Sequence, residues 1–279
     1  MRKGFRTFEK DRAQKMKRKL GINIDFMKDG FTFGAIKKIK AVGFDSISVT
    51  GVNWGFNKYK DISDSLGLDW EFVHAPFTNI NSMWLEGDDY LRIFGNMKEA
   101  ITHASLNGVP IVVLHLSSGW NPPEVNELGI KRFDELVKHA AQKNVTVAFE
   151  NLRNVENLEA IMEHYANTPN VKYCYDCGHE HCYTKDVDWI EKFGSKLCCV
   201  HIHDNFGIQE PEQECTDLHY LPFDGEIDFK DMIDRLDKVG FKGTLMLEVF
   251  NHCKPEYMEL TEEEFLKTSF ERISRIAEL

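Results

Sequence analysis

Short runs of apolar residues alternate along the chain with longer segments in which apolar residues recur every three or four positions. The short runs are rich in β-branched and aromatic residues, which is typical of strands. They lie at 20–26, 44–50, 69–76, 109–118, 145–152, 171–179, 197–205 and 243–250. Most of these runs are apolar on both faces, as expected of parallel strands that are covered by helices.

The segments between these runs have the spacing of amphipathic helices. The clearest are 31–43, 90–108, 130–144, 229–240 and 262–279, and the weakest follows the second strand. Gly43, Gly108 and Gly240 stand where helix C-caps are expected. Eight strands alternating with eight helices are typical of a (β/α)8 TIM barrel, a parallel eight-stranded barrel with outer helices. We therefore predict a single α/β domain over residues 19–279.

The amino-acid composition indicates a globular protein and argues against membrane spans and a disulfide framework. Of the 279 residues, 42% are hydrophobic and 28% charged, which is ordinary for a globular protein. No run of about 18 apolar residues predicts a membrane span, and no apolar signal segment follows the basic N-terminus. The seven cysteines are odd in number and lie in core-like strands, which favours reduced thiols over a disulfide framework. We therefore expect a cytoplasmic protein without a membrane partner.

Charge is distributed unevenly along the chain. The net charge of −11 makes the protein a poor generic binder of nucleic acid, because affinity for a phosphate backbone comes largely from Lys and Arg. The first 19 residues nevertheless hold nine Lys or Arg against two Asp or Glu. We expect residues 1–18 to form a flexible basic tail rather than a nucleic-acid-binding arm; a natural start at Met16 would omit most of it.

Ionisable side chains gather where the predicted strands end. They are His74, His115, Glu150, Asp176 with His179 three residues later, His201, His203, Asp204 and Glu248, joined by Asp217 and His219 in the loop after the seventh strand. In a barrel, the carboxyl ends of the strands meet at the face where active sites are built. Carboxylates crowded in a partly dry mouth repel one another and are costly to desolvate. A divalent cation removes both costs, so the set predicts a metal site.

The types of ligand narrow the choice of metal. Mixed imidazole and carboxylate groups without an obvious thiolate suit zinc, manganese, iron or cobalt better than calcium. Cys174 and Cys177 form a CxxC pair, but no second pair stands at zinc-site spacing, so we interpret them as structural. His201 and His203 share one side of a strand that is ending, so we expect His203, like Asp204, to stand behind the ligands.

Other polar and aromatic residues of the same face are candidates for contact with a ligand. Asn151 and Arg153 follow Glu150 directly, and Trp54, Phe77, Trp84 and Trp120 follow strands two, three and four. Aromatic side chains there can pack against a sugar ring, cap the barrel mouth or lie in a subunit contact. The sequence leaves these alternatives open.

Seven segments carry a resemblance to a known family: FVHAPF, VVLHLSS, AFENL, YDCGHEH, VHIHDNFG, DLHYLPFDGEIDF and MLEVF. On these segments the chain resembles the xylose isomerase-like TIM barrels, which group sugar phosphate isomerases and epimerases with endonuclease IV, the AP endonuclease family 2. The resemblance covers nearly the whole chain from about Leu20. It is specific for the superfamily and much less so for a reaction. Members are often dimers or tetramers, so a homo-oligomer is also an expectation.

In the sugar epimerase branch, the resemblance implies one divalent metal, with manganese or zinc preferred over cobalt or iron. It implies that Glu150, Asp176, His201 and Glu248 hold this metal, which polarises a carbonyl of a small carbohydrate. It further implies that Glu150 and Glu248 move a proton on opposite faces of the substrate through an enediolate.

In the endonuclease IV branch, the resemblance implies three zinc ions. It places the first with His74, His115 and Glu150, the second with Glu150, Asp176, His201 and Glu248, and the third with His179, Asp217 and His219. All nine ligands are matched, but Leu218 stands where that branch has Arg, and Asn151–Asn154 replaces its Thr-Ala-Gly-Gln-Gly loop. We predict a metal-dependent isomerase or epimerase of a small sugar, sugar phosphate or polyol. A multi-zinc phosphodiesterase acting on abasic DNA and a non-catalytic metal-binding barrel are the alternatives.

Overall fold

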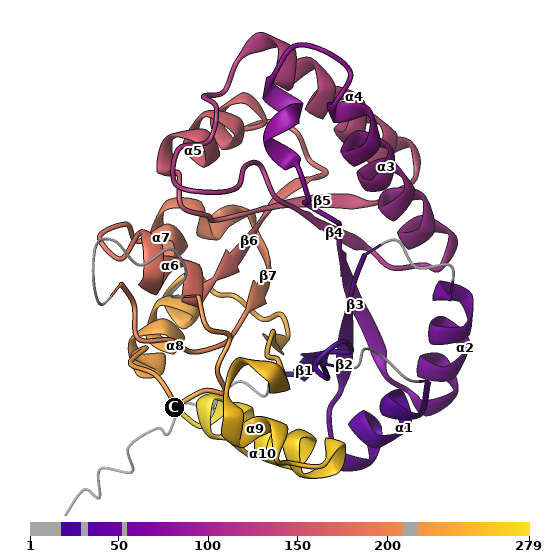
Figure 1. The fold of residues 1–279 in the computed structure, drawn as a ribbon, viewed down its shortest axis with the longest axis vertical. Helices are drawn as coiled ribbons and strands as arrows, with labels where there is room; N and C mark the ends of the chain where they lie inside the picture. The colour runs from indigo at the N-terminus through magenta and orange to yellow at the C-terminus, as the bar shows by residue number, and fades with distance from the viewer. Residues whose placement is uncertain (1–17, 29–32, 52–54, 209–216) are drawn as a thin grey trace, which may run out of the picture.

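The described part of the chain is a barrel of parallel strands surrounded by helices, a (β/α)8 TIM barrel (Figure 1). The computed structural model describes residues 18–28, 33–51, 55–208 and 217–279. The predicted fold class is therefore confirmed. The basic segment 1–17 and Trp54 lie outside the described residues, so the predictions made for them stay predictions. No helix within the described ranges is long and apolar enough to cross a membrane.

The strands follow one another around the barrel in chain order. They are β1 (Leu20–Asn23), β2 (Ser46–Thr50), β3 (Asp69–His74), β4 (Ile111–Leu114), β5 (Thr146–Glu150), β6 (Val171–Asp176), β7 (Leu197–His201) and β8 (Leu245–Leu247). Pairing is continuous from β7 through β1 to β8. An isolated parallel bridge between Ile202 and Leu247 joins β7 to β8 and completes the ring. There the Ile202 amide donates to the Met246 carbonyl, and the Glu248 amide donates to the Ile202 carbonyl.

Helices cover the outside of this ring. They are α1 (Phe33–Val42), α2 (Phe56–Leu66), α3 (Tyr90–Leu106), α4 (Glu127–Gln142), α5 (Val155–His164), α6 (Cys177–Tyr183), α7 (Trp189–Phe193), α8 (Phe229–Lys238), α9 (Pro255–Met258) and α10 (Glu262–Ala277), with 3-10 turns η1 (Ile80–Trp84), η2 (Gly194–Lys196) and η3 (Asn251–Cys253). The weakly predicted helix after the second strand is formed as α2. Gly43, Gly108 and Gly240 follow their helices at φ values of 124°, 66° and 73°, in the left-handed region that favours glycine at a helix end.

Every observed strand lies inside a predicted run but most end earlier than predicted. The run 171–179 shows why: the strand stops at Asp176, whose carboxylate accepts a hydrogen bond from the His179 amide at 2.6 Å and caps α6. His179 is therefore a helix residue. At β6 the chain leaves the sheet at an ionisable residue, because the Asp176 carboxylate takes up an amide in the first turn of the helix that follows.

A layer of apolar side chains fills the barrel axis. It consists of Phe72, Val113, Ala148, Cys174, Cys199 and Met246. Each of these is at most 2% exposed. Since side chains two positions apart along a strand point to the same face, the residues two positions later also face the axis. These residues are His74, His115, Glu150, Asp176, His201 and Glu248. The apolar layer therefore forms the floor on which the ionisable side chains stand.

Candidate metal centre

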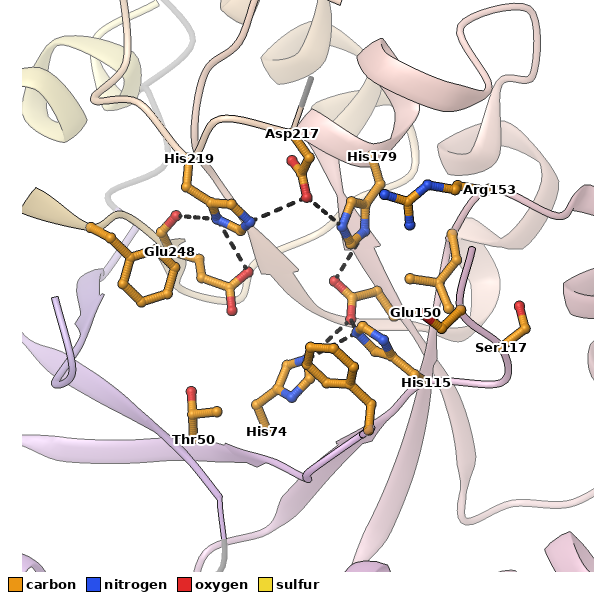
Figure 2. Close-up of a pocket in the computed structure, with 14 residues that line it drawn as sticks. Thr50, His74, His115, Ser117, Glu150, Arg153, His179, Asp217, His219 and Glu248 are labelled. Carbon is orange, nitrogen blue, oxygen red and sulfur yellow. Dashed lines mark hydrogen bonds and ion pairs between the residues drawn. The ribbon is translucent and has the colours of Figure 1, made fainter. Parts of the chain in front are cut away.

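A cavity of about 410 Å³ opens at the carboxyl ends of the strands (Figure 2). Its lining comes from the carboxyl ends of seven strands, β2 to β8, and from the segments that follow them. The lining residues are Thr50, His74, Phe77, His115, Ser117, Ser118, Glu150, Leu152, Arg153, His179, Asp217, His219, Glu248 and Phe250. The cavity thus holds most of the ionisable residues that the sequence predicted to converge.

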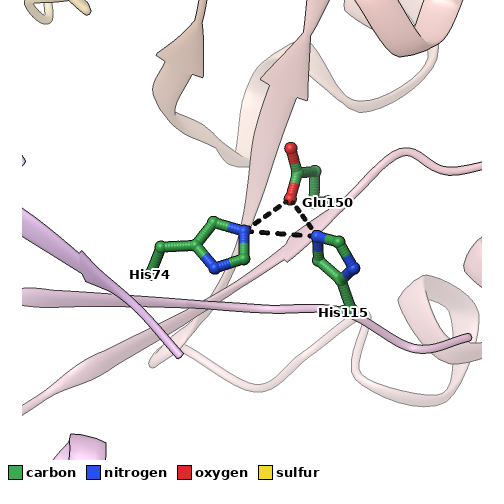
Figure 3. A group of neighbouring side chains, drawn as sticks. All are labelled: His74, His115 and Glu150. Atoms are coloured by element: carbon green, nitrogen blue, oxygen red, sulfur yellow. Dashed lines mark hydrogen bonds and ion pairs between the residues drawn. The ribbon is translucent and has the colours of Figure 1, made fainter. Parts of the chain in front are cut away.

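Three of these side chains form a compact group at the tips of β3, β4 and β5 (Figure 3). The Nε2 atoms of His74 and His115 lie 3.2 Å apart. The Oε2 atom of Glu150 lies 3.3 Å from the first and 2.9 Å from the second. The Phe77 ring stacks on the His115 imidazole at 4.2 Å between centroids, which fixes that ring. Two imidazole nitrogens and one carboxylate oxygen are therefore aimed at one point.

A second group shares Glu150 and lies deeper in the barrel. Its ligand atoms come from Glu150, Asp176, His201 and Glu248 and all lie within 4.8 Å of one another. The Nδ1 atom of His201 is central: it lies 2.7 Å from a Glu150 oxygen, 3.6 Å from Asp176 and 3.4 Å from Glu248. One imidazole and three carboxylates suit a divalent cation of the zinc or manganese type.

A third group surrounds Asp217 on the opposite wall. The Oδ2 atom of Asp217 lies 3.0 Å from Nε2 of His179 and 3.2 Å from Nε2 of His219. His203 joins this group as well, with Nε2 at 3.5 Å from Asp217 and 3.2 Å from Asp176. His203 was expected to stand behind the ligands, which stays a prediction; its Nε2 atom faces two carboxylates of the cluster. Stacking on the His219 ring, with 4.0 Å between centroids, holds it there.

Main-chain carbonyls fix which nitrogen of three histidines is free to bind. The Nδ1 atoms of His74, His179 and His219 lie 2.9, 2.9 and 3.0 Å from the carbonyl oxygens of Ala75, Asn151 and Glu248. A carbonyl can only accept, so Nδ1 must carry the proton, and in the neutral ring the lone pair is on Nε2. In all three residues Nε2 faces a carboxylate of the cluster, that of Glu150 for His74 and that of Asp217 for His179 and His219. This arrangement, in which Nδ1 donates to a main-chain carbonyl and Nε2 of the neutral ring presents its lone pair, is typical of metal-binding histidines.

The pKa values show how the cluster balances its charge without a metal. Burial alone would raise the pKa of Glu150, but His201 and hydrogen bonds from three imidazoles hold that pKa well below its usual range. Burial opposes the charged form of His201, yet Glu248 and Glu150 raise its pKa well above the ordinary value. The Asp217 carboxylate likewise outweighs burial and raises the pKa of His219 to about 10. Protons on the imidazoles therefore stand where a divalent cation would supply the positive charge.

The buried donor set fits a metal better than it fits protons alone. Glu150 and Asp176 have no more than 1% of their surface exposed. The Oδ1 atom of Asp217 is buried and accepts no hydrogen bond from the described residues. A carboxylate oxygen left without a donor is costly unless a cation sits beside it. The three groups are therefore candidate metal ligands.

Asp204 and Asn151 shape this site without lining the cavity. The buried Asp204 carboxylate accepts hydrogen bonds from the main-chain amides of Asn205, Phe223, Gly225 and Ile227 at 2.8–3.1 Å. These bonds fold the loop that carries His219. Asn151 receives the Asp176 amide and donates to the Asp176 carbonyl, both at 2.8 Å, and so ties the tips of β5 and β6 together. The oxygens of Asp204 are taken up by its four main-chain amides, and the prediction that Asp204 stands behind the ligands stays a prediction.

Two of the tryptophans predicted to contact a ligand differ in burial. Trp84 is only 2% exposed and donates from Nε1 to the Leu116 carbonyl at 2.7 Å. Its ring packs on Phe133, and no room remains between it and Gly129. Trp84 is therefore a core residue and not a substrate contact. Trp120 is 43% exposed and lies beside the guanidinium of Arg153, which lines the cavity.

The fold and this constellation define a TIM barrel with a candidate metal centre, and comparison with known proteins places it in a family. Residues 36–273 match the family described as xylose isomerase-like TIM barrel, and the chain belongs to this family. The resemblance noted from the sequence is thereby confirmed.

Among related sequences, the uncharacterized protein y4fM of Sinorhizobium fredii is 31% identical over 198 residues. The match spans 64% of this chain and 61% of that protein. The inosose dehydratase of Glaesserella parasuis is 28% identical over 135 residues, 42% of this chain and 45% of that enzyme. The chain thus matches less than two thirds of the length of either relative.

Solved structures of the same architecture include sugar epimerases. D-psicose 3-epimerase from Clostridium cellulolyticum, determined with D-tagatose, has a TM-score of 0.73 at 16% identity, covering 92% of this chain and 98% of the epimerase. The IOLI protein, determined with a zinc atom, has a TM-score of 0.72 at 20% identity, covering 93% and 98%. At these identities the likeness shows the fold alone.

Proposed function

We propose that the protein is a divalent-metal-dependent isomerase or epimerase of a small sugar, sugar phosphate or related polyol. The observation that carries the proposal is the group of Glu150, Asp176, His201 and Glu248, whose ligand atoms lie within 4.8 Å of one another at the base of the cavity. The activities of similar proteins, a 3-epimerase among the structures and an inosose dehydratase among the sequences, support the same class of substrate.

The chain's own residues would divide the work of proton transfer unequally. A divalent ion held by these four residues would polarise a substrate carbonyl and stabilise the oxyanion that forms when a neighbouring proton leaves. Glu248 lines the cavity with 14% of its side chain exposed, whereas the Glu150 side chain is fully buried. Three imidazoles also lower the basicity of Glu150. Glu248 is therefore the better proton acceptor, and Glu150 the carboxylate that holds the constellation together.

Exchange of substrate protons with heavy water tests this directly. Metal-loaded protein is incubated in D2O with ketopentoses, ketohexoses and an inosose, and deuterium at the carbon beside the carbonyl is followed by NMR. Glu248→Gln should lower the exchange rate by about 100-fold or more, within the range that a positioned general base contributes. Glu226→Gln, which changes an exposed carboxylate, is the control and should exchange normally. Exchange that survives intact in Glu248→Gln would remove Glu248 from the chemistry.

A second candidate, a three-zinc phosphodiesterase, is favoured by the outer groups. His74, His115, His179, Asp217 and His219 all face the same cavity, which a single-metal epimerase does not require. Two or three neighbouring cations suit phosphodiester cleavage because they stabilise both the attacking and the leaving oxygen. His219→Ala should abolish hydrolysis of an abasic duplex while leaving ketose exchange within about threefold of the parent protein. Elemental analysis of the purified protein decides between about one and about three metal ions per chain.

A further inference from the structure

Arg153 lines the cavity and has no acidic or carbonyl partner among the described residues, in contrast to four other arginines. Arg18 pairs with Asp237, Arg235 with Glu180 and Arg272 with Asp224. Arg132 instead donates to three or more main-chain carbonyls. Arg153 donates only to a hydroxyl within the described residues, and its Nε atom is buried without a hydrogen-bond partner there. A guanidinium with bare donors at a binding cavity calls for an explanation, since buried polar groups are rarely left unpaired.

Aromatic rings hold the Arg153 side chain in place. Its Nη2 atom donates to the Tyr183 hydroxyl at 2.6 Å, and the guanidinium lies 4.0 Å from the centre of the Tyr183 ring. The Trp120 ring lies 5.6 Å from the same guanidinium and packs edge-on against Tyr183. Rings bind the flat face of a guanidinium and leave its edge free. The edge of Arg153 is therefore fixed in position while most of its donors stay unused.

The cavity places this cation opposite the proposed base. Arg153 lines the same cavity as Glu150 and Glu248. Figure 2 shows Arg153 and Ser117 on one side, and Glu248 with His219 on the other. An anionic group on a ligand would be repelled beside the carboxylates and attracted beside Arg153, so the two sides favour opposite ends of a ligand. The arrangement gives an asymmetric ligand one direction of entry.

We propose that Arg153 binds a terminal oxyanion group of the substrate, a phosphate or a carboxylate, and directs the carbonyl end toward Glu150 and Glu248. This inference rests on the proposed isomerase or epimerase function and narrows its substrate to a charged sugar. The edge of a guanidinium matches two oxygens of a carboxylate or phosphate, which gives strength and direction together. Ser117 and Ser118, which line the cavity nearby, supply hydroxyl donors to the same group.

Calorimetry with unreactive polyols tests the proposal apart from catalysis. The probes are D-glucitol, D-glucitol 6-phosphate and D-gluconate, which lack the carbonyl that turnover needs, and the protein is the full chain loaded with Mn²⁺. The parent protein should bind at least one anionic probe roughly 10- to 100-fold more tightly than D-glucitol, as expected for charge-assisted bonds. Arg153→Gln should remove that preference. Arg153→Lys should keep part of it, because Lys retains the charge but not the planar fork.

The controls separate Arg153 from the metal and from folding. Arg92→Gln removes the same charge from the exposed side of α3 and should leave the preference unchanged. Preference for the phosphate over the carboxylate, or the reverse, identifies the source of the oxyanion. An anion preference that persists in Arg153→Gln would mean that the anion binds the metal, and it would overturn the proposal. Failure of the parent protein to bind any of the probes would also overturn it. Deuterium exchange of a ketose without a preference for anionic probes would support the proposed function and refute the role of Arg153. A preference for anionic probes without exchange of any ketose would support the role of Arg153 and refute the proposed function.

Discussion

Replacing Asp204 tests whether one buried carboxylate folds the loop that carries the outer metal ligands. Four main-chain amides donate to it, two to each oxygen. In Asp204→Asn, one oxygen remains as an acceptor and the new NH2 group faces two amides. Hydrogen bonds to a charged acceptor contribute about 1.5–3 kcal/mol each, and such terms do not add fully. We therefore expect a loss of about 3 kcal/mol for Asp204→Asn and about 5 kcal/mol for Asp204→Ala.

The assay is thermal unfolding followed by circular dichroism, paired with elemental analysis of bound metal. For a chain of this size a 3 kcal/mol loss corresponds to roughly 6–12 °C in melting temperature. Asp228→Ala is the matched control, because Asp228 caps α8 through one exposed hydrogen bond and should cost only about 1 kcal/mol. Asp204→Asn should also lose metal from the group around Asp217 before the group around His201. The reasoning is refuted if Asp204→Asn is no less stable than Asp228→Ala.

Two further predictions concern the histidines of the outer group. The folded pKa of His219, about 10, lies above its unfolded value of about 6.5. In metal-free protein the contribution of His219 to stability should be complete below about pH 6.5 and lost as the pH rises through 10. Bound metal should reverse this trend, because it displaces the proton from the imidazole. Melting temperatures measured from pH 6 to 10 with and without chelator would change in parallel if His219 does not bind metal. A Cβ at Gly178 would collide with the His203 ring, so Gly178→Ala should displace that ring and lower the metal content. Gly95→Ala is the control, because no atom lies near a Cβ at that position, and it should keep its metal. Unchanged metal content in Gly178→Ala would argue that His203 binds no metal.

The convergence of the metal ligands was predictable because it follows from the period of a strand. In six strands an apolar interior residue is followed two positions later by a His, Asp or Glu, as in Ala148 and Glu150 or Cys174 and Asp176. Parallel pairing then brings those positions to one level of the barrel. The ring and its ligands were therefore contained in local patterns repeated along the chain.

What the sequence did not reveal depends on contacts between distant segments. Trp84 is buried because Gly129, more than 40 residues later, leaves a hollow for its ring. Asp204 is structural because amides from the following loop fold around it. The binding nitrogen of His219 is chosen by the carbonyl of Glu248, a group that no sequence pattern marks. Arg153 was named from its position beside Glu150, but its lack of an acidic partner among the described residues emerges only in three dimensions.

A metal ion bound between β7 and β8 would help to hold the barrel closed. Between these strands the barrel is completed by a bridge at Ile202 and Leu247, where other neighbouring strands share longer ladders. Glu248 lies just past β8 and His201 ends β7, so an ion held by both would clasp the two edges of the sheet across that join. Local opening in proteins starts where cooperative pairing is shortest. Loss of the ion should therefore let β7 and β8 separate first. Amide hydrogens of Ile202 and Glu248 should then exchange faster than those in the β4–β6 ladders.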